Sequence, residues 1–141
     1  ASRAARGACV GMAVCLVAML VFSVRGLESF LSIKRTDLAA TEWLQARVPP
    51  GASVVTFGLT LTLQHYTGLD AVEIYAETPT TLADRICGRA PVYAYLDVAN
   101  LESQWAGLSP EINYRWLRDG PGLTALGRYQ DYSLFEIGGC E

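Results

Sequence analysis

The sequence has few of the residues on which enzymes rely, and its single histidine is His65. A Ser-His-Asp or Cys-His site needs that histidine beside a nucleophile and an acid, yet no G-x-S-x-G nucleophile elbow is present. One histidine with scattered carboxylates is weak support for a metal site. We therefore predict no catalytic residue, no metal ligand and no cofactor in this chain. His65 is expected at the exposed end of a short helix and is kept as a ligand-groove candidate.

Phosphate-binding glycine motifs are also missing. The stretch "PPGASVVTFGLTLTLQHYTG", residues 49–68, has the strand–turn–helix layout of a nucleotide-binding unit. Such a unit needs G-x-G-x-x-G or G-x-x-x-x-G-K-[ST], so that the backbone can approach a phosphate at a helix N-terminus. After the strand, only Gly58 is available. We expect Gly58 to end the strand and keep it as a ligand-groove candidate only.

Positive charge is scarce in most of the chain. Residues 1–36 carry a net charge of +4, whereas residues 37–141 carry a net charge of −7. Nucleic-acid-binding proteins present basic faces to phosphates, so we expect no nucleic-acid partner. A basic segment next to an apolar run suits an anionic membrane surface.

One long apolar run is present near the start. Residues 7–24 hold 18 positions without a charge, or about 27 Å of helix at roughly 1.5 Å per residue. We predict a basic flank over residues 1–6 and a transmembrane helix over residues 7–27, extended past Arg25 if that side chain reaches the interface. A signal peptide and a buried helix are the alternatives, but no A-x-A-like cleavage site follows Val24.

The residues after the apolar run continue in helical periodicity. Residues 28–36 form a juxtamembrane segment that either lies at the headgroups or serves as a plain connector. Thr36 or Asp37 is a candidate cap for a new helix, and "VPPG" ends the helical pattern because proline disfavours helix.

Residues 37–141 alternate between strand and helix patterns. We predict strands over 52–58, 71–76 and 90–98, with short helices between them over 59–68 and 78–89. One or two helices follow over 100–122, and a hairpin over 123–137 ends the domain. This order predicts a small three-layer α/β domain, its sheet mostly parallel with a C-terminal antiparallel hairpin.

Two further features are candidate sites. Asp97 follows the third strand, where open α/β sheets bind ligands, but it is also a helix cap. The aromatic residues Trp105, Tyr114 and Trp116 with Arg115 and Arg118 resemble a sugar or phosphate platform. The spacing of Trp105, Leu108, Ile112, Trp116 and Leu117 instead favours a helix stripe facing the core.

Four cysteines are present, two in the apolar run and two in the predicted domain. Cys9 and Cys15 are interpreted as apolar filler. Cys87 and Cys140 form a possible disulfide if the domain faces an oxidising compartment. That pairing would pin the C-terminal strand to the second helix.

The order of these patterns resembles a known family. The apolar run, "VPPGASVVTFG", "LQHYTG", "ADRICGRAPVYAYLD" and "GRYQDYSLFEI" are similar to the C-terminal end of GT-C type membrane glycosyltransferases. These include protein O-mannosyltransferase-like enzymes and the lipid A aminoarabinose transferase. The resemblance implies a last transmembrane helix, an extracytoplasmic α/β domain, and sugar transfer from a polyprenyl-phosphate carrier. The family's catalytic acid lies in a loop of the membrane domain that has no counterpart here.

The expected function follows from that resemblance. We expect a non-catalytic extracytoplasmic domain at the cell membrane that shapes the acceptor side of such an enzyme. Its partners would be the lipid bilayer, the membrane domain of the same enzyme or another membrane protein, and a lipid-linked sugar. The simplest interpretation is a C-terminal piece of the enzyme. The alternatives are a single-pass binding or assembly module and a tethered enzyme with a site near Asp97 and Gly58.

Overall fold

The computed structural model describes residues 3–89 and 91–139. The chain divides into two compact units, residues 1–36 and residues 37–141. The elements, in chain order, are α1 (Arg3–Gln45), β1 (Ser53–Thr56), α2 (Thr60–Tyr66), β2 (Asp70–Glu73), the 3₁₀ turn η1 (Ile74–Ala76), α3 (Pro79–Ile86), β3 (Val92–Leu96), α4 (Val98–Ser103), α5 (Ser109–Asp119), β4 (Leu123–Tyr129) and β5 (Tyr132–Ile137).

The first unit consists of α1, which continues into the second unit without a break. Within the described residues, α1 is the one helix long and apolar enough to cross a membrane. Its large apolar side chains are exposed in the segment that precedes the domain, from Met12 to Ile33. A helix surface of this kind is stable in lipid, because its backbone groups are paired internally and its side chains match the hydrocarbon.

The expected new helix start at Thr36 or Asp37 is wrong. The Thr36 hydroxyl donates a hydrogen bond to the Ser32 carbonyl, 3.1 Å away and one turn earlier. A threonine that bonds back to the preceding turn stays inside a helix instead of capping a new one. The predicted transmembrane and juxtamembrane segments, 7–27 and 28–36, therefore lie in one helix.

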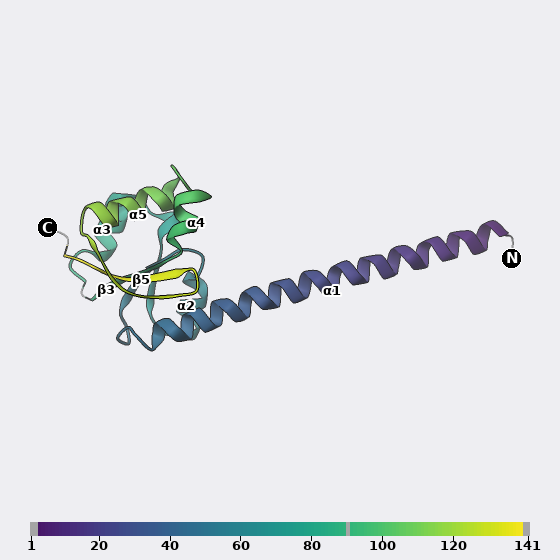
Figure 1. The fold of residues 1–141 in the computed structure, drawn as a ribbon, viewed down its shortest axis with the longest axis horizontal. Helices are drawn as coiled ribbons and strands as arrows, with labels where there is room; N and C mark the ends of the chain where they lie inside the picture. The colour runs from purple at the N-terminus through teal and green to yellow at the C-terminus, as the bar shows by residue number, and fades with distance from the viewer. Residues whose placement is uncertain (1–2, 90, 140–141) are drawn as a thin grey trace. The chain divides into compact units, whose positions relative to one another are not determined.

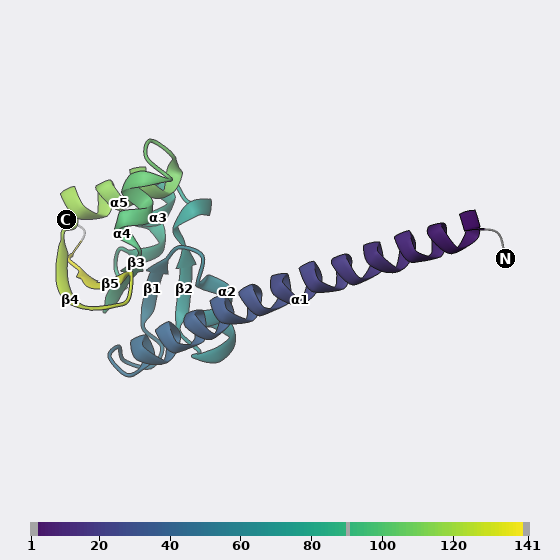
Figure 2. The ribbon, with the colours of Figure 1, turned by 45° about the vertical axis from the view of Figure 1, so that its right-hand side comes forward.

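The second unit is a three-layer α/β domain around a five-stranded sheet. The strand order is β2-β1-β3-β5-β4. β2, β1 and β3 are parallel to one another. β5 runs antiparallel to both of its neighbours, β3 and β4. Figure 1 shows α3, α4 and α5 gathered on one side of the strands, and Figure 2 shows β1 and β2 side by side. The predicted fold class is confirmed.

Each face of the sheet has its own apolar core. The first core joins Ala40 and Leu44 of α1 and Leu63 of α2 to sheet residues such as Val54 and Tyr95. Residues at positions 40 and 44 lie on the same side of a helix, which explains why both are buried. The last turns of α1 are therefore part of the folded domain.

The second core lies under α3, α4 and α5. It includes Leu82, Leu101 and Leu117 from the helices and Val55 and Ala94 from the sheet. Strands β1 and β3 are buried along their whole length, as expected for continuous apolar strands covered on both faces. The predicted start of α3 is confirmed, because Thr78 caps it in a capping box and Pro79 follows.

The strand predicted over 71–76 is shorter than expected. β2 ends at Glu73, and residues 74–76 form η1. The Glu73 side chain accepts a hydrogen bond from the Tyr75 backbone N–H at 3.3 Å. A side chain that captures a backbone donor two residues later favours a turn over a continued strand. This turn directs Tyr75 away from the sheet ladder, and its ring is 56% exposed.

Candidate functional site

A shallow pocket lies beside the carboxyl ends of β1 and β2. It has a volume of about 340 Å³ and is lined by Phe57, Gly58, Glu73, Tyr75 and Trp105. Phe57 and Gly58 directly follow β1, Glu73 is the last residue of β2, and Tyr75 lies in η1, which directly follows β2. Ligands of open parallel sheets bind outside the carboxyl ends of the strands. We call this group of five residues the aromatic pocket.

Three aromatic rings form the walls of the aromatic pocket. The rings of Phe57 and Tyr75 are inclined by only 24°, with their centroids 6.5 Å apart. The Trp105 ring is nearly perpendicular to both, at 81° to Phe57 and 80° to Tyr75. Its centroid lies 5.0 Å from that of Phe57 and 5.7 Å from that of Tyr75. Edge-to-face contacts of this kind are favourable and fix the rings relative to one another.

The carboxylate of Glu73 joins the two turns that line the aromatic pocket. Its Oε2 accepts a hydrogen bond from the Thr60 hydroxyl at 2.7 Å and from the Gly58 N–H at 3.3 Å. Its Oε1 accepts the Tyr75 N–H. One side chain thus ties the turn after β1 to the turn after β2.

These contacts decide what Gly58 does. Gly58 has a φ of +77°, a conformation that glycine adopts without strain. Its N–H, which would face a phosphate in a nucleotide-binding turn, already meets the Glu73 carboxylate. Since that carboxylate is an anion at the place a phosphate would take, the turn favours structure over phosphate binding.

The turn that carries Tyr75 is fastened from a second direction by α5. The Asn113 amide donates to the carbonyls of Ile74 at 2.9 Å and Glu77 at 2.7 Å. Ser109 donates to the carbonyls of Tyr75 at 3.3 Å and Glu77 at 2.9 Å. Asn113 is fully buried, and its Oδ1 has no hydrogen-bond partner among the described atoms. The buried Asn113 and the half-buried Ser109 therefore hold the backbone of the turn that carries the exposed Tyr75.

The other predicted ligand-groove residues are not brought together with Gly58. Asp97 accepts the Asn100 N–H at 3.0 Å and caps α4, so the capping alternative is the one observed. His65 is exposed near the end of α2, and its ring packs edge-on against Tyr66 at 4.6 Å. Among the described residues, no group of three His, Cys, Asp or Glu side chains is placed to hold a metal ion.

The arginine-rich aromatic platform is also not formed. Arg115 pairs with Glu111 at 2.8 Å, and Arg118 pairs with Asp119 at 2.7 Å. Tyr114 is buried, and burial raises the pKa of its hydroxyl. Trp105 lies between α4 and α5 and lines the aromatic pocket.

The alternative core stripe is only partly correct. Leu117 is buried, but Leu108 is 52% exposed and Ile112 is 41% exposed. A single stripe over these residues requires one continuous helix, whereas α4 ends at Ser103 and α5 begins at Ser109, so of the one or two helices expected over residues 100–122 two are present. Because the two helices have different axes, residues of α5 do not continue the face that residues of α4 present to the core.

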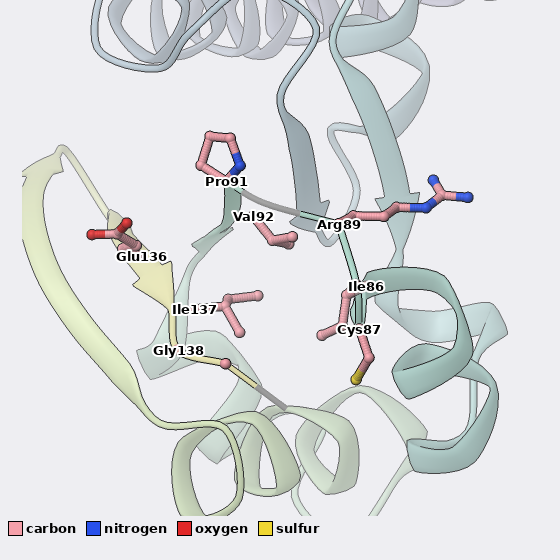
Figure 3. Close-up of a pocket in the computed structure, with 10 residues that line it drawn as sticks. Ile86, Cys87, Arg89, Pro91, Val92, Glu136, Ile137 and Gly138 are labelled. Atoms are coloured by element: carbon pink, nitrogen blue, oxygen red, sulfur yellow. The ribbon is translucent and has the colours of Figure 1, made fainter. Parts of the chain in front are cut away.

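A second hollow, of about 390 Å³, lies near the start of β3 and the end of β5 (Figure 3). Ile86, Val92 and Ile137 point toward one another there, whereas Arg89 and Glu136 point away. No convergent set of reactive groups lines it among the described residues. Cys87 borders this hollow and is disulfide-bonded. Cys140, its predicted partner, lies outside the described residues, so that pairing stays a prediction.

The chain matches no protein-family model, no curated protein and no solved structure. The functional assignment therefore rests on the residues and geometry described above. Sequence reasoning missed Phe57, Glu73 and Tyr75 as site residues. The available signal was that all three lie at the ends of neighbouring strand patterns, where parallel strands place their side chains on one edge.

Proposed function

We propose that this chain is a membrane-tethered, non-catalytic extracytoplasmic domain of a glycosyltransferase that takes sugar from a polyprenyl-phosphate donor. The observation that carries the proposal is α1 itself. One apolar helix with exposed side chains ends in turns whose Ala40 and Leu44 are completely buried in the domain core. A domain whose chain runs directly into an apolar helix would be tethered to the bilayer.

The polar groups near the strand ends support an accessory role. Gly58, Glu73 and Asp97 sit where an α/β enzyme would hold a ligand. Each of them is engaged in holding a turn or a helix start. In this proposal the chemistry belongs to the membrane domain, and the α/β domain shapes the entrance used by the acceptor.

The decisive experiment is a deletion in the full-length enzyme. Removing residues Ile33–Glu141 should lower the rate of sugar transfer or change the choice of acceptor, measured with a labelled polyprenyl-phosphate sugar. His65→Ala is the control, because this side chain is exposed and lies outside every pocket described here. Unchanged rate and acceptor choice after the deletion would contradict the proposal.

A single-pass binding module is the second candidate, and the exposed aromatic pocket is the observation that favours it. The two candidates differ in gene context and in biochemistry. If the deletion leaves transfer intact while the domain still binds a ligand or partner through the pocket, the binding module is correct.

The extracytoplasmic placement has its own test. A membrane-impermeant protease added to sealed cells, with the outer layers permeabilised where present, should digest the domain and leave the transmembrane segment, residues 7–27, protected. Protection of the domain in intact cells, with digestion only after lysis, would place it in the cytoplasm and overturn this part of the proposal.

A further inference from the structure

The three rings of the aromatic pocket contact one another. Phe57 and Tyr75 have similar orientations, and Trp105 stands at nearly a right angle to both. All centroid separations are 6.5 Å or less. A cation is attracted to a ring face when it lies within about 6 Å of the ring centroid, so rings this close together can act on one cation at the open surface of the pocket.

The charge of the pocket also favours a cation. Glu73 is the one charged side chain among the five lining residues, and it is held in place by hydrogen bonds from Gly58, Thr60 and Tyr75. Residues 37–141 have a net charge of −7. An anion would be repelled by the Glu73 carboxylate, whereas a cation is attracted by both the carboxylate and the ring quadrupoles.

We propose that the aromatic pocket binds a methylated ammonium head group. A primary ammonium has three N–H donors, and a carboxylate has about four acceptor positions in all, of which protein donors already occupy three at Glu73. A trimethylammonium group donates no hydrogen bond and presents a large, soft cationic surface to ring faces. The volume of about 340 Å³ accommodates such a head group. This inference goes beyond the proposed function and does not depend on sugar transfer.

The first test compares choline with its neutral isostere 3,3-dimethylbutan-1-ol. The full chain, in maltoside micelles, is ¹⁵N-labelled, and the indole N–H signals of its three tryptophans are followed by NMR during titration. We expect choline to shift the Trp105 signal with at least ~3-fold higher affinity than the alcohol, while the Trp116 signal stays in place. Equal affinities, or no shift of Trp105 with either compound, would overturn the proposal.

Matched variants locate the interaction. Tyr75→Leu should weaken choline binding about 2- to 6-fold, whereas Tyr75→Phe, which keeps the ring, should bind as the parent does. Tyr75→Leu also removes the ring contacts with Phe57 and Trp105, so the melting temperatures of both variants are measured and binding is compared below the unfolding transition. If Tyr75→Leu binds choline as tightly as Tyr75→Phe does, the aromatic pocket is not the choline site.

The head group has two possible sources, a free solute or a choline lipid. Chain reconstituted in phosphatidylcholine nanodiscs without free choline is compared with chain in phosphatidylglycerol nanodiscs. A Trp105 shift confined to phosphatidylcholine identifies the lipid, and a shift that needs added choline identifies the solute. Identical Trp105 signals in both lipids, with no response to choline, would overturn the proposal.

Discussion

The two faces of the sheet are covered in different ways. On the first face, α1 and α2 contribute apolar side chains, and Trp43 of α1 stacks on Tyr95 of β3 with ring centroids 5.9 Å apart. On the second face, α5 adds a buried amide, Asn113, that binds backbone carbonyls of the turn after β2. The first face attaches the domain to its helix by packing, whereas the second positions an exposed ring by hydrogen bonds.

This difference separates two tasks within one small domain. Apolar packing on the first face is non-directional and tolerates small shifts of the side chains. Such packing is sufficient to hold the last turns of α1 on the sheet. Hydrogen bonds on the second face have strict geometry, as required to place Tyr75 against Phe57 and Trp105. Substitutions on the two faces should therefore have distinct consequences.

The largest effect is expected on the first face. Leu44→Ala should lower the free energy of unfolding by about 2–5 kcal/mol, because it leaves a cavity in a completely buried site. All three tryptophans lie in residues 37–141, so their fluorescence during urea unfolding in micelles reports the domain alone. Ile112→Ala, at an exposed position, is the control. A loss no greater for Leu44→Ala than for Ile112→Ala would show that α1 is not part of the core.

An intermediate effect is expected on the second face. Asn113→Ala leaves the carbonyls of Ile74 and Glu77 without this buried donor and should cost about 1–3 kcal/mol in the same unfolding assay. It should also weaken choline binding by releasing the turn that carries Tyr75. Leu44→Ala, measured below its unfolding transition, should leave choline binding unchanged. Loss of choline binding in both variants would contradict the separation of the two faces.

The smallest effect is a pH dependence on the first face. Burial, together with the nearby Asp37, Asp97 and Asp131, raises the pKa of Tyr132 to about 12, and burial also raises the pKa of Tyr95. The unfolded hydroxyl titrates near pH 10, so the neutral form favours the folded state. Its stabilising contribution is complete below pH 10 and is lost as the pH rises toward 12.

The measurement is thermal stability between pH 9 and pH 12. Tyr132→Phe should fall less steeply with pH than the parent, whereas Tyr66→Phe, at an exposed ring, should follow the parent. Parallel curves for the parent and Tyr132→Phe would show that this hydroxyl does not contribute.

Local signals explain which elements could be predicted. The β-branched run at Val54 and Val55 and the apolar run at Val92–Leu96 identify strands that are buried on both faces. Thr78 and Pro79 mark a helix start because capping and proline geometry involve only neighbouring residues. The helix start expected at Thr36 failed, since its hydroxyl has an equally local alternative partner in Ser32.

Contacts between distant residues explain what could not be predicted. Tyr75 is separated from Phe57 and from Trp105 by long stretches of chain, and these three rings meet only after β1, β2 and the segment before α5 are assembled. Glu73 reads as one of several scattered acids in the sequence. Its role is visible only when Gly58 and Thr60 lie beside it.

By itself, the sequence determined an apolar helix near its start, a βα alternation and a terminal hairpin, because propensity, capping and hydrophobic period act over a few residues. Only the tertiary structure decided that the helix continues into the domain core and that three separated aromatic rings border one pocket. The physical reason is that side-chain packing and buried hydrogen bonds join residues that no local pattern relates.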